Sequence, residues 1–184
     1  MKSTFKLFPI AITASVASLL TIPPSGSVAL PSDDSQAVNS QLKDKEYLSL
    51  VSVRANEITV GTRNTEYYFT INIPKSSHSL QKVNIAQRGG YDIIRFHQQR
   101  IRAYVIGEIR KEIKIANIEP ESQGISITFA EPVEPGQRLT VVMGVKENPL
   151  NDGNYLFVVT VFPEGKLDMG QSLGVGRLRI TSVL

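Results

Sequence analysis

The residues that could do chemistry in this chain are mostly basic, and six of them fall within twenty positions. They are Arg95, Arg100, Arg102, Arg110, Lys111 and Lys114. In a β-strand, residues two apart project to the same side, so Arg100 and Arg102 would share a face. Such a face could bind an acidic partner or a headgroup, and we take the six as candidate binding residues. The alternative is an ordinary solvated face. Glu108 and Glu112 lie in the same run, and the mixed signs favour this alternative.

The two histidines do not form a recognisable metal or catalytic motif. A zinc or acid–base site needs two or three ligands that converge. His78 lies in a polar segment, and His97 shares a face with the cationic Arg95 if strand alternation holds. The segment Asn151–Asn154 offers oxygen ligands, but it lacks the alternating acids and final glutamate of a calcium loop. We interpret it as a turn built on asparagine and glycine.

Other catalytic patterns are equally weak. The segment Gly170–Gly176 is rich in glycine, but it has no lysine and no helix pattern follows it, so it does not match a phosphate-binding loop. We interpret it as a strand in which small residues allow close packing against Tyr155–Phe162. The chain contains no cysteine, which excludes disulfides, thiolate metal sites and cysteine nucleophiles. We therefore predict that the protein is not an enzyme and holds no metal or cofactor.

The N-terminus has the form of an export signal. Lys2 and Lys6 precede an apolar stretch over Leu7–Ile22, and the small residues Ser27 and Ala29 suit signal peptidase. We predict cleavage after Ala29, which makes residues 1–29 a signal peptide. An uncleaved anchor is the alternative, but the apolar stretch is shorter than the roughly 20 residues that span a bilayer.

Charge and composition describe what remains after cleavage. Residues 30–45 are polar and predict a flexible tail. The mature chain keeps 18 basic and 17 acidic residues, so it is nearly neutral. Near neutrality gives no electrostatic reason to expect nucleic acid or an anionic membrane surface as a partner. No segment of the mature chain is long and apolar enough to predict a transmembrane helix.

Residues 46–184 have the texture of a single β-rich domain. Short runs of Val, Ile, Thr, Tyr and Phe alternate with clusters of turn residues, which is typical of an all-β sandwich or barrel. In Glu66–Ile73 the large apolar residues fall on one face of a strand. We predict an antiparallel β-sandwich of seven to nine strands with immunoglobulin-like architecture, and a closed β-barrel is the alternative. The candidate strands are Tyr47–Arg54, Glu66–Ile73, Lys82–Gln87, Ile93–Gln98, Ile101–Ile106, Ile113–Ile118, Gly124–Phe129, Arg138–Val145, Tyr155–Phe162 and Gly174–Thr181.

Two connections, one strand and one possible helix carry more specific expectations. The two glycines in Arg88–Asp92 predict a hairpin turn between the strands on either side. Pro132–Gly136 predicts a second turn, and Tyr155–Phe162 is apolar on both faces, as expected of a central strand. Asp92–Ile109 can also be fitted loosely to a helical period, so a short helix remains an alternative there.

Several motifs occur in an order that resembles a known family. They are YYFTINIP, LQKVNIAQRGGYDIIRF, ISITFAEPVEPGQRLTVVM and the block from Asn148 to Leu178. Together they resemble the exported cyanobacterial family called domain of unknown function 2808, over roughly residues 47–181. The resemblance implies export, a β-rich domain and a photosynthetic bacterial lineage. It implies no activity and no catalytic residue.

These observations favour a non-catalytic module outside the cytoplasm that binds or scaffolds a protein or an envelope partner. The compartment would be the periplasm, the thylakoid lumen or the cell surface. A ligand or metal carrier with a shallow site is the second hypothesis, and a hydrolase is the third. A large core without a converging polar site is what separates the first hypothesis from the others.

Overall fold

The computed structural model describes residues 47–106 and 110–182. The predicted signal peptide (1–29) and tail (30–45) lie outside the described residues, and both stay predictions. Every regular element in the described part is a β-strand. That part contains no helix with the length and apolar character needed to cross a membrane.

Ten strands form the described part of the chain. They are β1 (Ser49–Ala55), β2 (Arg63–Ile73), β3 (Leu80–Gly89), β4 (Phe96–Ile106), β5 (Arg110–Ile113), β6 (Ile115–Glu121), β7 (Gly124–Val133), β8 (Gln137–Glu147), β9 (Gly153–Pro163) and β10 (Gln171–Ile180). The prediction of seven to nine strands was therefore too low. The candidate strand Ile113–Ile118 divides at Lys114 into β5 and β6, and these two belong to different sheets.

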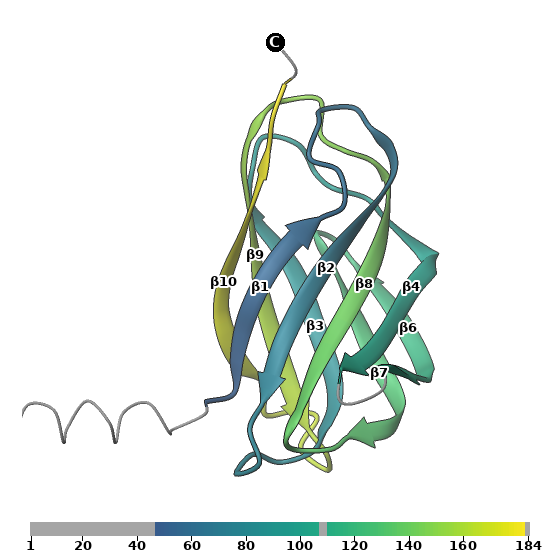
Figure 1. Ribbon diagram of the computed structural model, residues 1–184, viewed down its shortest axis with the longest axis vertical. Coiled ribbons are helices and arrows are strands. Elements are labelled where there is room, and N and C mark those ends of the chain that lie inside the picture. The colour runs from purple at the N-terminus through teal and green to yellow at the C-terminus, as the bar shows by residue number, and fades with distance from the viewer. Residues whose placement is uncertain (1–46, 107–109, 183–184) are drawn as a thin grey trace, which may run out of the picture.

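The strands form two five-stranded antiparallel sheets that are stacked as a sandwich (Figure 1). We call the sheet with order β1-β2-β8-β4-β5 the front sheet, since it faces the viewer in Figure 1. The back sheet has the order β10-β9-β3-β7-β6. The predicted immunoglobulin-like sandwich is confirmed, and the closed barrel is wrong, because the strands do not join into one continuous sheet.

Alternation along the strands builds the core between the two sheets. Tyr67, Phe69 and Ile71 of β2 are fully buried, as the period-two pattern predicted. In β9 only the inward row is fully buried, whereas the outward residues, such as Leu156, are partly exposed. The strand is therefore covered on one face by the core and only partly on the other.

The segment around Gly90 is not the predicted hairpin turn. Strand β3 pairs with β7 and β9, whereas β4 pairs with β8 and β5, so the chain crosses from one sheet to the other. Buried Gln87 supports this crossing, because its amide donates to the Asp92 carbonyl at 2.7 Å and its oxygen accepts from the Ile94 N–H at 2.9 Å. Gly90 has a φ of +122°, and a Cβ there would collide with the ring of Tyr155. The glycine thus serves close packing rather than a turn between paired strands.

Two further expectations need correction. Strand β7 continues to Val133, so the turn before β8 is shorter than the predicted Pro132–Gly136. The region that could be fitted to a helix contains strand β4, and its described residues form no helix. In both places β-pairing across the sheet decides the outcome, and the local sequence carries no information about that pairing.

The side of the sandwich between β1 and β10 is tied together near the upper end in Figure 1. Thr59 forms an isolated bridge with Thr181. The Val60 N–H donates to the Thr181 carbonyl at 3.0 Å, and the Thr181 N–H donates to the Ile58 carbonyl at 2.8 Å. These bonds join the two sheets just beyond the ends of β1 and β10.

Candidate functional site

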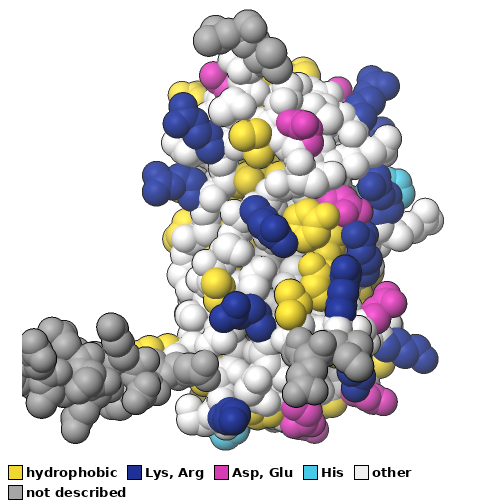
Figure 2. Space-filling view, viewed as in Figure 1, with side chains coloured by type: hydrophobic (Ala, Val, Ile, Leu, Met, Phe, Trp, Pro, Cys, Tyr) yellow, Lys and Arg dark blue, Asp and Glu magenta, His cyan; other side chains and the backbone are white. Residues whose placement is uncertain are grey.

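Arginine and tyrosine side chains gather on the outer face of the front sheet. The register places Arg54 opposite Tyr68, Tyr68 opposite Val142, and Val142 opposite Arg102. In Figure 2 dark blue basic side chains border a yellow hydrophobic area on this side of the molecule. We name this surface the arginine–tyrosine face. It comprises Arg54, Glu66, Tyr68, Thr70, Arg100, Arg102, Tyr104, Arg110, Arg138, Thr140 and Val142.

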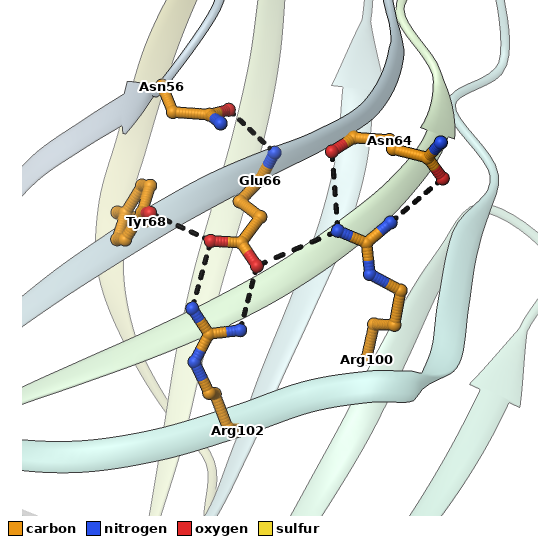
Figure 3. Close-up of polar contacts among 6 residues, drawn as sticks. All are labelled: Asn56, Asn64, Glu66, Tyr68, Arg100 and Arg102. Carbon is orange, nitrogen blue, oxygen red and sulfur yellow. Dashed lines mark hydrogen bonds and ion pairs between the residues drawn. The ribbon is translucent and has the colours of Figure 1, made fainter.

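Glu66 on β2 is the ionic centre of the face. Arg102 donates to its two carboxylate oxygens at 2.8 and 2.9 Å, and the Tyr68 hydroxyl donates to it at 2.8 Å. Arg100 approaches the same carboxylate at 3.8 Å and donates to the side-chain oxygen of Asn64 at 3.0 Å. Figure 3 shows both arginines reaching toward Glu66 from the same side, as the spacing of two predicted. Two of the six candidate cations therefore share a single carboxylate within the protein, and the cluster keeps a net positive charge.

This geometry keeps Glu66 ionised. The bidentate hydrogen bond from Arg102 lowers the pKa of Glu66 from its ordinary 4.5 to about 2, against the opposing effect of burial. The Tyr68 hydroxyl lowers the pKa of Glu66 further, and the charge of Arg100 adds a smaller effect in the same direction. The pKa of Tyr68 is raised in turn by burial and by its bond to Glu66. The cluster is thus a fixed ion pair across the whole physiological pH range.

We expect Glu66→Gln to lower the free energy of unfolding at neutral pH by about 1–3 kcal/mol, because it removes charge-assisted hydrogen bonds to Arg102. The pKa of Glu66 is lower in the folded state, so its contribution is complete above about pH 4.5 and is lost as the pH falls through about 2. Urea unfolding of both proteins over this range should show the difference shrink toward acid. Glu119→Gln is the control, since its 3.5 Å pair with Lys82 is exposed and worth little. An equal effect of the two substitutions would contradict the assignment.

The other arginines of the face are held by aromatic rings or stand alone. The guanidinium carbon of Arg54 lies 5.0 Å from the ring centre of Tyr68, and that of Arg110 lies 3.6 Å from the ring centre of Tyr104. A guanidinium over a ring is attracted by the ring quadrupole and loses much of its conformational freedom. Arg54, Arg110 and Arg138 are exposed, and none of them forms an ion pair with a carboxylate in the described part.

The middle of the face is covered by these side chains. Val142 is 0% exposed, Thr140 is 1% exposed and Tyr104 is 6% exposed, although they point away from the main core. The Thr70 and Thr140 hydroxyls lie 3.3 Å apart, within hydrogen-bonding distance. Long arginine stems can cover apolar surface while their charged heads stay in water. The arginine stems therefore cover a small outer cluster of Tyr104, Thr140 and Val142, and the charged ends of the arginines face the solvent.

Gly144 on β8 fixes the place of Arg100. A Cβ at Gly144 would lie 2.5 Å from the Cβ of Arg100, because β4 is irregular between Phe96 and Ile101 and its backbone approaches β8 closely here. Glycine leaves the room in which the start of the Arg100 side chain sits. The local sequence around Arg100 gives no sign of this contact with a strand some forty positions later.

The remaining candidate cations do not join the face. The register puts Lys111 opposite Val105, in the other row of β5 from Arg110, and Lys111 is exposed at this sheet edge. Lys114 is exposed at the junction where the chain passes from β5 to β6. Arg95 is exposed before β4 and lines a shallow hollow with Lys146 and Leu150. The six candidates are therefore divided among several surfaces, and only Arg100, Arg102 and Arg110 share one.

The other motifs take structural positions. His78 follows β2 and His97 lies at the start of β4, and the described residues hold no group of three metal-ligating side chains. Asn151 uses its backbone and side-chain N–H groups to bind the Asp92 carboxylate, each at 2.9 Å. This clamp lowers the pKa of Asp92 and ties the segment to a distant residue. Gly153 and Asn154 already belong to β9, so the segment Asn151–Asn154 is not the predicted local turn. Gly170 lies against Phe162 of β9, in keeping with close packing there.

Sequence reasoning found only Arg100, Arg102 and Arg110 of the face. It missed the ionic centre Glu66 and the other residues that hold or extend the charge, among them Arg54, Arg138, Tyr68 and Tyr104. Arg54 and Arg138 stand far from the run of basic residues along the chain, and only the strand register brings them to the same surface. The paired tyrosines Tyr67 and Tyr68 did offer a clue. In an alternating strand one of them must point outward, where its ring can pack against a long neighbouring side chain.

Comparison with known proteins adds a family and a set of similar folds. Solved structures with a similar fold include the collagen-binding subdomain of the Enterococcus faecalis surface protein ACE (8% identity, 76% of this chain and 100% of that chain, TM-score 0.46). A collagen-binding domain from a Staphylococcus aureus adhesin (12% identity, 73% and 99%, TM-score 0.43) is also similar. So is a non-cellulosomal cohesin from Archaeoglobus fulgidus (9% identity, 71% and 91%, TM-score 0.38).

No curated protein matches this chain. The family described as "Protein of unknown function (DUF2808)" matches residues 42–180, which is most of the sequence. The match includes all ten strands and the four motif blocks that carry the resemblance in the sequence. The chain therefore belongs to the DUF2808 family of proteins of unknown function.

Proposed function

We propose that this protein is a non-catalytic binding or scaffolding module outside the cytoplasm, and that its arginine–tyrosine face holds a negatively charged protein or envelope partner. One observation carries the proposal. Arg54 and Arg110 are each held over a tyrosine ring, and neither is paired with a carboxylate in the described part of the chain. Oriented guanidinium groups with free donors are well suited to carboxylate, sulfate or phosphate oxygens.

Charge is concentrated on this surface although the mature chain is nearly neutral. The face has five arginines and Glu66, and Glu112 of β5 projects beside Tyr104. A local excess of positive charge attracts anionic partners and raises the rate of encounter with them. The predicted signal peptide would place this surface in the periplasm, the thylakoid lumen or at the cell surface.

The edges of the sheets are less suitable for binding a partner. Strand β6 carries Pro120 between Glu119 and Glu121, which interrupts the hydrogen-bonding row and adds charge. Strand β5 has only four residues. A bridge between Thr59 and Thr181 holds the chain together just beyond the ends of β1 and β10. A flat sheet face is therefore the better surface for recognition.

A paired charge reversal tests the proposal. We expect Arg54→Glu with Arg110→Glu to abolish retention of the protein on isolated envelope fragments and on the extracytoplasmic protein fraction of the source cells. High salt should weaken retention of the unchanged protein, because exposed charges are screened.

The matched control is Arg177→Glu with Arg179→Glu, which makes the same charge change at exposed positions of β10 on the back sheet. Thermal unfolding should show that both double variants are folded. If the two double variants bind as well as the unchanged protein, or lose binding equally, the front face is not the binding surface.

A further inference from the structure

Building on this proposed function, we infer that the partner is an acidic protein surface, and that the arginine–tyrosine face is the centre of a protein–protein interface. The composition of the face is the first reason. Arginine and tyrosine are enriched at interface centres and among the residues that dominate binding energy, whereas lysine is depleted. The face as defined carries its positive charge on arginine alone. Lys146 follows Gly144 by two residues, near the end of β8, and lies outside the face.

The size of the face is the second reason. Arg54 on β1 and Arg110 on β5 are separated by four strand spacings, which is about 19 Å. Along the strands, the face extends from the row of Glu66 and Arg100 to the row of Arg138 and Arg110, which is six residue steps or about 20 Å. The product, about 400 Å², is half of the roughly 800 Å² that one partner contributes to a standard interface, so the face has the size of an interface centre. A single headgroup or phosphate is too small to contact both arginines.

Preorganisation is the third reason. Ordering mobile side chains opposes association, and the cost is smaller when they are already held. Here Tyr68 and Tyr104 hold two arginines, and Glu66 fixes Arg102 with two hydrogen bonds. The apolar centre at Val142 is fully covered, so it offers nothing that would insert into a lipid bilayer.

Charge also decides against a second copy of this chain as the partner. A two-fold dimer would place the same face on both subunits, with arginines opposite arginines. Such like charges repel. Carboxylates on a different protein would instead complete the bidentate geometry that a guanidinium prefers.

Site-specific photo-crosslinking in the source cells tests this inference. A photoreactive residue replaces Ile106, which is 50% exposed beside Arg110 and Arg138, or Val175 on the back sheet, which is 61% exposed. We expect a discrete protein adduct from position 106, no adduct from position 175, and loss of the adduct in the double charge reversal at positions 54 and 110.

The crosslinked protein, once purified, should bind the full chain, and the double charge reversal should weaken binding about thirtyfold or more. The acidic residues of that protein that lie at the contact can then be replaced by arginine. This replacement should restore binding to the variant with the reversed charges at positions 54 and 110. The inference is wrong if no adduct forms from position 106, or if the same adduct still forms in the variant with reversed charges.

A protease treatment separates this inference from the proposed function. If retention on envelope fragments depends on Arg54 and Arg110 but survives complete digestion of their proteins, the partner is a polymer or lipid. The protein-partner inference is then wrong, and the proposed function stands. If retention never depends on the two arginines, both are wrong.

Discussion

The substitution Phe157→Ala is expected to lower the free energy of unfolding by about 3–5 kcal/mol. Phe157 of β9 is fully buried between the sheets. Its ring stands edge-on to Phe69 with ring centres 5.3 Å apart and to Tyr67 at 6.2 Å, and it lies 6.4 Å from Phe96. One ring of the back sheet thus contacts three rings of the front sheet, and its removal opens a cavity where the two sheets meet.

Phe162→Ala on the same strand is the matched control. Phe162 points outward, is partly exposed and contacts the Lys82 ammonium at 5.5 Å, so we expect a loss of no more than about 1.5 kcal/mol. Urea unfolding at neutral pH measures both values. Similar losses for the two substitutions would show that the aromatic cluster is not the main contact between the sheets. Because Tyr67 and Phe69 flank Tyr68 on β2, the same cluster anchors a strand of the arginine–tyrosine face.

Alternation made the sandwich predictable. A strand repeats every two residues, so the inward rows of β2 and β8 could be read directly from the spacing of their large apolar residues. Residues such as Phe69 and Val141 are buried as that pattern requires. Predicting which side of a strand faces the core does not require knowing its neighbouring strands. The local sequence is therefore sufficient for this prediction.

Strand partners were not predictable in the same way. The glycines near Gly90 suggested a hairpin because glycine permits tight turns, but the constraint comes from the Tyr155 ring, which lies far along the chain. Likewise, nothing local marks Lys114 as the point where the chain changes sheet. Pairing is set by contacts between distant segments, and in such places long-range packing overrides local preference.

The arginine–tyrosine face shows the same limit of prediction from the sequence. Arg100 and Arg102 were correctly placed on one side of a strand, but their partner, Glu66, lies on another strand 36 residues before Arg102. They appear free in the sequence and are paired in the fold. Arg54 and Arg138 look isolated in the sequence, yet the register brings them to the same surface. The charge of this surface therefore has to be summed over neighbouring strands, and the charge of one continuous sequence segment does not predict it.

The second large effect is expected at Asn148, which holds the loop that precedes β2. Its side-chain N–H groups donate to the Glu57 carbonyl at 3.0 Å and to the Thr59 carbonyl at 2.8 Å. Its oxygen accepts from the Tyr67 hydroxyl at 2.9 Å, and burial raises the pKa of Tyr67, so this hydroxyl keeps its proton. Asn148 is only 2% exposed, and water cannot easily replace these bonds. We expect Asn148→Ala to lower the free energy of unfolding by about 2–4 kcal/mol.

A double-mutant cycle with Tyr67→Phe identifies the bond responsible. The sum of the two single losses of unfolding free energy should exceed the loss in the double variant by about 1 kcal/mol or more. Each single substitution leaves a buried polar group unpaired, whereas the double substitution removes both partners of the bond. Asn72→Ala is the control, since its bond to the Tyr47 carbonyl is exposed and should matter by less than about 0.5 kcal/mol. Purely additive losses would mean that Asn148 stabilises the loop only through its hydrogen bonds to the Glu57 and Thr59 carbonyls. In that case the link between the loop and the core would not pass through Tyr67.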